Sequence, residues 1–411
     1  HSIRSISSMV LGGMVIGAIA FGAWVLVSWW ESPVEKWLDK AEIAHTIGGA
    51  VEASHFPEQL EVDLEGERKK IKIEYSFDAH LQSLTSKLIK RYNPDFAAFV
   101  AIDVKTGQIL TLVDHVGVKR EIDGNLALKA TFPAASIFKL VTAAAAIGED
   151  KATANTVIAF NGSNHTLYKR NVEHTQLNRW TRHMTLKEAF GKSINTVFGK
   201  LGLFFVGPQN LLEYARRFGF NEPIPADIPV EMGQVKIEPG DRWALAESAS
   251  GFTQENKMSP IHGALIASAV ANDGVMMEPY LIKRIIDEEE RTLYKAQPKI
   301  ATVTMDLNTA RELKILMHET VKSGTSRGAF RPFLRSKKFG DIEVGGKTGT
   351  LTGKDPGGKC DWFVGYANHD GHSIAVAALT IHEKYWKVKS SYLARRFFED
   401  YFEDRLRLEV K

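Results

Sequence analysis

The protein has 411 residues, and its 52 lysine and arginine residues nearly balance 49 aspartate and glutamate residues, for a formal net charge of +3. Hydrophobic residues make up 44% and charged residues 25%, which are ordinary globular values that exclude a disordered or low-complexity chain. The charge balance, without a long basic run, gives no support for nucleic-acid binding. A single cysteine, Cys360, excludes an internal disulfide and a cysteine-based metal site.

Residues 9–30 form an apolar block without a charged side chain, and the block ends in Trp29 and Trp30. A helix of these 22 residues spans about 33 Å, which is enough to cross a bilayer core. A cleaved signal peptide, the main alternative beside a buried core helix, would have a shorter apolar region and a small-residue cleavage site. We therefore expect residues 1–30 to be a cytoplasmic stub and a retained anchor.

The charges that flank this block predict its orientation in the membrane. Arg4 precedes the block, whereas Glu31 and Glu35 follow it. This arrangement favours a cytoplasmic N-terminus, because positive charges remain on the inner side. We expect a single-pass protein of the inner (cytoplasmic) membrane whose remaining chain lies on the extracytoplasmic, periplasmic side.

The chain after the anchor divides into a short linker and one large domain. Residues 31–70 are expected to form a juxtamembrane linker, with an amphipathic stretch that ends at Gly48-Gly49, and residues 71–411 the domain. Apolar and polar residues alternate over 71–77, which predicts a half-buried strand, and residues 81–89 have helical spacing. Two apolar runs at 96–103 and 108–113 surround Lys105-Thr106-Gly107 and predict a β-hairpin.

The rest of the domain is predicted to contain a helical block and then three strands. Helical stretches are expected near residues 134–147, 185–203, 208–218, 260–271 and 307–322. Strands are expected at 342–351, 361–367 and 373–381, before an amphipathic helix that carries Leu393, Phe397 and Tyr401 on one face. Clustered strands, without regular alternation of strand and helix, predict an α/β fold of the α+β type with a mostly antiparallel five-stranded sheet flanked by helices.

The first candidate catalytic element is the run 132–147, which is nearly all apolar apart from Ser136, Lys139 and Thr142. Side chains three residues apart share a helix face, and burial favours the neutral amine of Lys139. A neutral amine can take the hydroxyl proton of Ser136 and so activate it as a nucleophile. Backbone N–H groups are free in the first turn of a helix and can stabilise an oxyanion. An ordinary buried helix is the alternative, because this spacing is common by chance.

Two further polar elements strengthen that interpretation. Residues 192–196 supply Ser193 and Asn195, a hydroxyl and an amide that can relay a proton and hold a substrate amide. Residues 345–350 read Gly-Gly-Lys-Thr-Gly-Thr in a strand context, where glycines let a substrate backbone approach closely. Lys347 and the neighbouring threonine hydroxyls offer a cation and hydrogen-bond donors for a carboxylate.

Ser-x-x-Lys, Ser-x-Asn and Lys-Thr-Gly in this order resemble the signature of the penicillin-binding protein and serine β-lactamase superfamily. The chain is most similar to the transpeptidase domain of high-molecular-weight penicillin-binding proteins, over roughly residues 72–385. The similar stretches include Gly251-Phe252, Asn272-Asp273-Gly274, Ser323-Gly324-Thr325-Ser326 and the strand of Trp362. The resemblance implies the β-lactamase/transpeptidase-like fold and a serine-type D,D-transpeptidase that needs no cofactor or metal.

The resemblance also implies a role for each catalytic residue. Ser136 attacks a peptide carbonyl and forms an acyl-enzyme, after Lys139 has taken the serine proton. Ser193 helps to return a proton to the leaving D-alanine, and Asn195 orients both the substrate amide and Lys139. An acceptor amine then resolves the acyl-enzyme into a peptidoglycan cross-link. β-Lactams such as penicillin act on such sites as covalent inhibitors.

The same resemblance assigns substrate binding to the late glycine-rich strand. Lys347 polarises the site around the substrate carboxylate, which Thr348, Gly349 and Thr350 bind. The backbone N–H groups of Ser136 and Thr350 form the oxyanion hole. The expected ligands are therefore peptidoglycan stem peptides.

The sequence departs from the family pattern at two points. Ala135 stands where the family often has a glycine before the nucleophile. About 40 residues separate Trp30 from the strand at Ile71, too few for a glycosyltransferase domain or a large pedestal. Glycan polymerisation is therefore not carried over from the family, and a separate glycosyltransferase becomes a candidate partner.

Other functions are possible alternatives to a transpeptidase, and the sequence excludes some of them. A D,D-carboxypeptidase or a β-lactamase shares the acylation chemistry, and a non-catalytic penicillin sensor or cell-wall scaffold would use binding alone. A phosphate-binding loop is excluded at both places where its pattern nearly occurs. Before Gly346-Lys347-Thr348, Asp341 stands in place of the required glycine. After Gly358-Lys359, Cys360 stands in place of the required serine or threonine. No His-Glu-x-x-His motif supports a zinc peptidase.

Overall fold

The computed structural model describes residues 38–52, 54–64, 66–118, 120–174, 177–238 and 240–409. The predicted anchor at residues 9–30 lies outside these ranges and stays a prediction. Within the described ranges, no helix combines the length and the apolar character that crossing a membrane requires.

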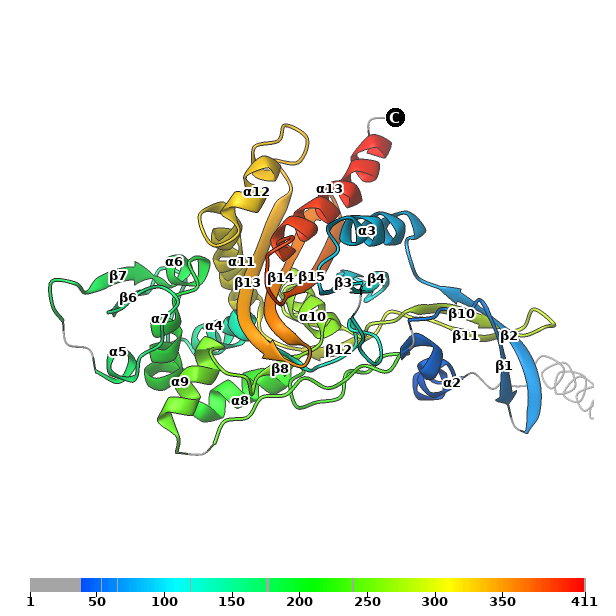
Figure 1. Cartoon of the computed structure of the whole chain (residues 1–411), viewed down its shortest axis with the longest axis horizontal. Coiled ribbons are helices and arrows are strands. Elements are labelled where there is room, and N and C mark those ends of the chain that lie inside the picture. The colour runs from blue at the N-terminus through cyan, green and yellow to red at the C-terminus, as the bar shows by residue number, and fades with distance from the viewer. Residues whose placement is uncertain are drawn as a thin grey trace, which may run out of the picture.

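A five-stranded antiparallel sheet forms the centre of the molecule (Figure 1). Its strands are β13 (Glu343–Lys354), β14 (Gly357–His369), β15 (His372–His382), β3 (Phe96–Asp103) and β4 (Ile109–Val116), in this spatial order. The predicted early hairpin and three late strands are confirmed, and β15 pairs with β3 to join them. Because β13 has a sheet neighbour on one side only, its outer edge is available to another chain.

Helices cover both faces of this sheet, as the amphipathic patterns predict. One face packs against α10 (Pro260–Ala271) and α11 (Leu307–Lys322), and every residue of α10 is buried. The helix α4 (Lys139–Gly148) packs against α11. The other face packs against α3 (Ala79–Tyr92), α12 (Arg327–Leu334) and α13 (Ser390–Glu409). Burial on both faces explains why β15 is an almost continuous apolar run rather than an alternating one.

The helical block beside the sheet differs from its prediction at residues 185–203. The structure divides this stretch into α6 (Leu186–Gly191), α7 (Asn195–Lys200) and the π-helical turn Leu201–Val206. Thr185 caps α6 by accepting a hydrogen bond from the Glu188 N–H, and the chain turns at Ser193, whose φ is +56°. The block also contains β6 (Val157–Phe160), α5 (Lys169–Glu173), β7 (Arg182–Thr185), α8 (Gly207–Arg217) and α9 (Arg242–Ser250).

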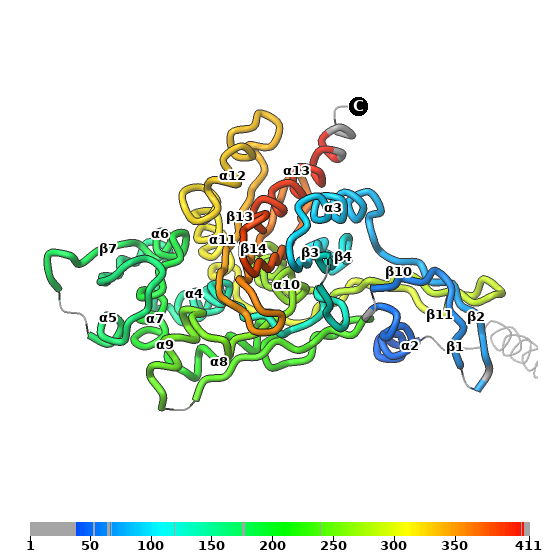
Figure 2. Tube along the Cα trace, in the orientation of Figure 1, coloured from blue at the N-terminus to red at the C-terminus, as the bar shows by residue number. Residues whose placement is uncertain are grey.

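A second, four-stranded sheet projects from the end of the molecule opposite to this helical block (Figure 2). It consists of β1 (Gln59–Leu64), β2 (Glu67–Tyr75), β10 (Ile282–Ile286) and β11 (Thr292–Lys295). The helix α2 (Lys40–Glu52) packs Ile43 and Ile47 into the same core as Ile71 and Ile73. The segment for which the sequence predicts a linker therefore contains a packed helix and a paired strand.

Two short strand pairs and one 3₁₀ turn complete the framework. β5 (Phe132–Pro133) pairs with β8 (Lys257–Met258) directly before the candidate nucleophile. β9 (Val275–Met277) pairs with β12 (Ile300–Val303) beyond the end of α10. The 3₁₀ turn η1 (Ala135–Phe138) connects β5 to α4 and places the nucleophile turn against β13.

Candidate active site

Ser136 lies on a constrained turn at the wall of a cavity of about 820 Å³. The sequence predicts a helix from residue 134, but the α-helix begins only at Lys139, after η1. Ala135, directly before Ser136, has a φ of +49°, a left-handed conformation that favours glycine. Gly251 lies so close that a Cβ atom there would be 1.9 Å from the Ala135 carbonyl oxygen. The nucleophile turn is therefore held by close backbone packing.

A second contact fixes the same turn to the sheet. The Trp362 indole on β14 donates a hydrogen bond of 3.0 Å to the Pro133 carbonyl oxygen. Gly349 on β13 lies against η1, because a Cβ atom there would be 3.2 Å from Cγ1 of Ile137. The late strands thus set the position of Ser136, and a larger residue at 349 would push the strand away from the turn.

Lys139 is fully buried directly beneath Ser136. Its Nζ lies 2.7 Å from Ser136 Oγ, 2.8 Å from Asn195 Oδ1 and 2.5 Å from the Ser250 carbonyl oxygen. Burial, and then the positive charge of Lys347, hold the pKa of Lys139 well below its ordinary value. A neutral amine in this place donates its two N–H bonds to the carbonyl oxygens and keeps its lone pair for the Ser136 proton.

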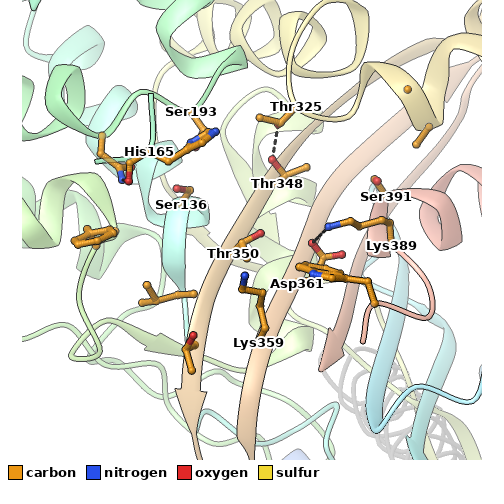
Figure 3. Close-up of a pocket in the computed structure, with 18 of the residues that line it drawn as sticks. Ser136, His165, Ser193, Thr325, Thr348, Thr350, Lys359, Asp361, Lys389 and Ser391 are labelled. Carbon is orange, nitrogen blue, oxygen red and sulfur yellow. Dashed lines mark hydrogen bonds and ion pairs between the residues drawn. The ribbon is translucent and has the colours of Figure 1, made fainter. Parts of the chain in front are cut away.

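The side-chain amide of Asn195 is oriented by a loop of the helical block. Its Nδ2 donates a hydrogen bond of 2.8 Å to the His165 carbonyl oxygen, so its Oδ1 faces Lys139. The exposed His165 ring lines the same cavity (Figure 3). Partial burial, and next the charge that Lys139 carries when protonated, lower the pKa of His165. The sequence predicts no role for His165, because nothing in its local pattern relates it to Asn195.

Lys347 and Ser193 form a second buried pair across the cavity. Lys347 Nζ donates hydrogen bonds to Ser193 Oγ at 3.0 Å and to the Thr348 carbonyl oxygen at 2.8 Å. Burial lowers the pKa of Lys347 to about 7. This amine therefore titrates near neutral pH, and a substrate carboxylate beside it favours the charged form.

Threonines of β13 line the cavity beside the nucleophile. The Thr348 and Thr350 side chains face it, and the Thr348 hydroxyl is hydrogen-bonded to that of Thr325 (Figure 3). Thr325 belongs to the predicted Ser-Gly-Thr-Ser stretch, but the sequence alone assigned it no function. The structure thus brings the sequence-predicted site residues together. Ser136, Ser193, Asn195, Thr348 and Thr350 line one cavity. The buried Lys139 and Lys347 are hydrogen-bonded to Ser136 and Ser193, and Gly349 packs against the nucleophile turn.

The described part of the chain contains no group of three or more histidine, cysteine, aspartate or glutamate side chains that could hold a metal ion. The site is instead built from two lysines, hydroxyls, an amide and backbone groups. Such a set can activate a serine, return its proton and bind a carboxylate.

Comparisons with known proteins agree with this chemistry. The model of the penicillin binding protein transpeptidase domain matches residues 97–403. The chain is 28% identical over 306 residues to stage V sporulation protein D of Bacillus subtilis (strain 168), covering 70% of this chain and 45% of that protein. It is 29% identical over 264 residues to the peptidoglycan D,D-transpeptidase PbpA of Mycolicibacterium smegmatis, covering 62% of this chain and 51% of that protein. The chain thus spans about half the length of these relatives.

Solved structures show the same fold. The D,D-transpeptidase domain of a peptidoglycan glycosyltransferase from Eggerthella lenta has a TM-score of 0.67 at 21% identity, over 91% of this chain and 92% of that chain. The imipenem acyl-enzyme complex of penicillin-binding protein A from M. tuberculosis has a TM-score of 0.64 at 24% identity, over 80% and 79%. At these identities the structures establish the fold, and the family model covers most of the sequence. The chain belongs to the penicillin-binding protein transpeptidase domain family.

Proposed function

We propose that this protein is a peptidoglycan D,D-transpeptidase that joins stem peptides through an acyl-enzyme on Ser136. The observation that carries the proposal is the fully buried Lys139, whose Nζ lies 2.7 Å from Ser136 Oγ. Only a neutral amine can act as a base, and burial supplies this neutral amine at the nucleophile itself.

Acylation moves one proton and exchanges one bond. Lys139 takes the Ser136 hydroxyl proton as Oγ attacks the carbonyl carbon of the D-alanyl-D-alanine bond. The oxyanion that forms is stabilised by the backbone N–H groups of Ser136 and Thr350. The proton then passes by way of Ser193 to the nitrogen of the leaving D-alanine, and the carbon–nitrogen bond breaks.

The substrate carboxylate binds where Lys347 and the threonines of β13 meet. Thr348 and Thr350 offer hydroxyls on the cavity wall, and the buried Lys347 offers the cation behind them. The carboxylate raises the proton affinity of Lys347 and so couples substrate binding to the charge of this amine. Asn195 holds the donor amide while its Oδ1 keeps Lys139 in place.

Deacylation reverses these proton movements with a different nucleophile. The amine of a second stem peptide attacks the ester carbonyl, loses a proton to Lys139 and receives the acyl group, while Ser136 regains its proton. A β-lactam acylates Ser136 by the same first step, and its opened ring remains attached. β-Lactams are therefore expected to be covalent inhibitors.

The proposal also includes the location of the catalytic domain relative to the membrane. The apolar block at residues 9–30 supports a single membrane anchor, and the flanking charges support an extracytoplasmic catalytic domain. A separate glycosyltransferase at the same membrane is the candidate partner that would supply new glycan strands.

Incubation of the purified protein with glycan strands that carry pentapeptide stems tests the proposal. Cross-linked muropeptide dimers with release of D-alanine are expected, and Ser136→Ala is expected to form none. Trimmed monomers without dimers would replace the transpeptidase by a D,D-carboxypeptidase. Catalytic turnover of benzylpenicillin would indicate a β-lactamase, and binding of penicillin without any peptide product would indicate a sensor.

A further inference from the structure

The cavity at Ser136 continues well beyond the nucleophile. It passes over β13 to Lys359 and Asp361 on β14 and to Lys389 in the loop between β15 and α13 (Figure 3). Trp386 of the same loop also lines it. We name these four residues the distal end of the cavity. Nothing in the proposed acylation chemistry uses them, yet they lie in the same continuous space as Ser136.

Two lysine ammonium groups share one aromatic ring at the distal end. Lys389 Nζ lies 3.0 Å and Lys359 Nζ lies 5.7 Å from the centroid of the Trp386 ring. Figure 3 shows the Lys359 side chain directed toward Thr350 and the Lys389 side chain directed toward Asp361. Two cations on one ring repel each other, and an anion placed between them relieves that repulsion.

The protein itself offers little negative charge to balance these lysines. Asp361 is the one acidic side chain among the described residues that line the cavity, and its Oδ1 lies 3.8 Å from Lys389 Nζ. Its Oδ2 accepts a hydrogen bond of 2.8 Å from the Ser390 N–H. Among the described residues, Lys359 has no acidic side chain within ion-pair distance. The distal end therefore carries an excess of positive charge.

The sheet geometry directs a donor side chain toward this charge. Thr348, Thr350 and Thr352 alternate along β13 on the cavity side, and Asp361 lies opposite Thr350 on β14. A peptide extended along the free edge of β13 presents every second side chain to the same face. The Trp386 ring, which is 39% exposed, offers an apolar surface for the methylene groups of such a side chain.

We propose that the distal end is a subsite for an aliphatic side chain with a terminal carboxylate on the donor residue before D-alanyl-D-alanine. The carboxylate lies between Lys359 and Lys389, and the methylene groups pack on Trp386. This assignment rests on the proposed transpeptidase function, and it predicts that the enzyme distinguishes a free side-chain carboxylate from its uncharged amide.

A matched pair of penicillins tests the subsite. Adipoyl penicillin has a carboxylate at the end of its acyl side chain, and its ω-carboxamide differs only in that group. Acylation rates are measured by intact-protein mass spectrometry at low salt. The native protein is expected to react about fivefold faster with the carboxylate, an effect the size of one exposed ion pair. The double variant Lys359→Gln/Lys389→Gln is expected to lose this preference.

Three controls separate the subsite from general effects. Lys389→Arg keeps the charge and should keep the preference, and Lys295→Gln/Lys337→Gln removes the same total charge at exposed sites outside the cavity and should also keep it. Benzylpenicillin should acylate every variant within about twofold of the native rate, because it does not reach the two lysines. Equal rates for the two adipoyl compounds in the native protein, or a preference that survives the double variant, would overturn the subsite alone. Failure of every penicillin to acylate Ser136 would overturn the proposed function and the subsite together.

Discussion

The two ends of the cavity each contain a pair of lysines, but water reaches only one pair. At the nucleophile, Lys139 and Lys347 are both fully buried. At the distal end, the Lys389 side chain is 54% exposed and Lys359 is also exposed. Full burial lowers the pKa of Lys139 well below its ordinary value and that of Lys347 to about 7. Partial burial also lowers the pKa of Lys389, but there the nearby Asp361 carboxylate opposes the shift. A motif in the sequence identifies a lysine, but the burial of that side chain in the fold determines how far its pKa is lowered.

The largest expected effect comes from exchanging lysine for arginine at both ends. Lys139→Arg should lower the benzylpenicillin acylation rate by at least about 10³-fold, because a guanidinium does not give up its proton in proteins. Lys389→Arg should change the rate by less than about twofold, because benzylpenicillin does not reach the distal end. Stopped-flow or mass-spectrometric acylation rates measure both, with circular dichroism to establish folding. Similar losses in both variants would remove the distinction between the two ends.

Two glycines on the cavity wall, Gly251 and Gly328, differ in how closely other parts of the backbone pack against them. In Gly251→Ala the new Cβ would meet the Ala135 carbonyl at 1.9 Å, and the φ of +67° disfavours alanine. We expect a loss of about 2–4 kcal/mol in the free energy of unfolding, and slower acylation because the Ser136 turn must move. At Gly328 on α12, by contrast, a Cβ atom would meet no neighbouring element within 4 Å. Gly328→Ala should therefore be neutral or stabilise by up to about 1 kcal/mol.

Urea unfolding measures these two glycine variants against the native protein. Gly251→Ala with native stability and native acylation would show that the nucleophile turn does not depend on close packing. A large loss in Gly328→Ala would show that the start of α12 is packed as tightly as the nucleophile turn.

The smallest expected effect is a pH dependence of stability that arises from the buried pair. Burial lowers the pKa of Lys347 to about 7 in the folded protein, whereas an unfolded lysine has a pKa of about 10.4. Above about pH 7 the unfolded chain binds a proton that the folded chain does not bind, so stability rises with pH. The slope is up to about 1.4 kcal/mol per pH unit for this one group. Lys139, whose pKa is also lowered, acts in the same direction.

Urea unfolding between about pH 7 and 8 tests this slope, in a range where the Cys360 thiol of the unfolded chain, with an ordinary pKa of about 8.5, stays mostly protonated. Lys347→Met should reduce the slope, and Lys389→Gln should leave most of it. A slope that is unchanged in Lys347→Met would mean that Lys347 keeps its proton in the folded protein.

Local pattern was enough to predict several of the elements that surround the site. The predicted helices at 260–271 and 307–322 coincide with Pro260–Ala271 and Leu307–Lys322, because a serine or aspartate cap precedes an uninterrupted apolar pattern. The five strands of the central sheet follow from clustered apolar runs. The order of motifs also indicated which side chains meet, although they are far apart in the chain.

Other features depend on contacts that no local pattern contains. The break at Ser193 was not predicted, because the apolar spacing continues through it and only the pairing with Lys347 explains the turn. The second sheet was missed, because β2 finds its second partner, β10, more than two hundred residues later. Lys359 and Lys389 each resemble an ordinary surface lysine, and only the fold places them on one tryptophan.

The most direct test of Ser136 as the nucleophile is to locate the penicillin adduct on the protein. Incubation with benzylpenicillin, followed by intact-mass measurement and peptide mapping, should show one penicilloyl group, attached to Ser136. Ser136→Ala should show none, although its fold is retained. An adduct on another residue, an adduct that persists in Ser136→Ala, or no adduct on the folded native protein would contradict the claim that Ser136 is the nucleophile.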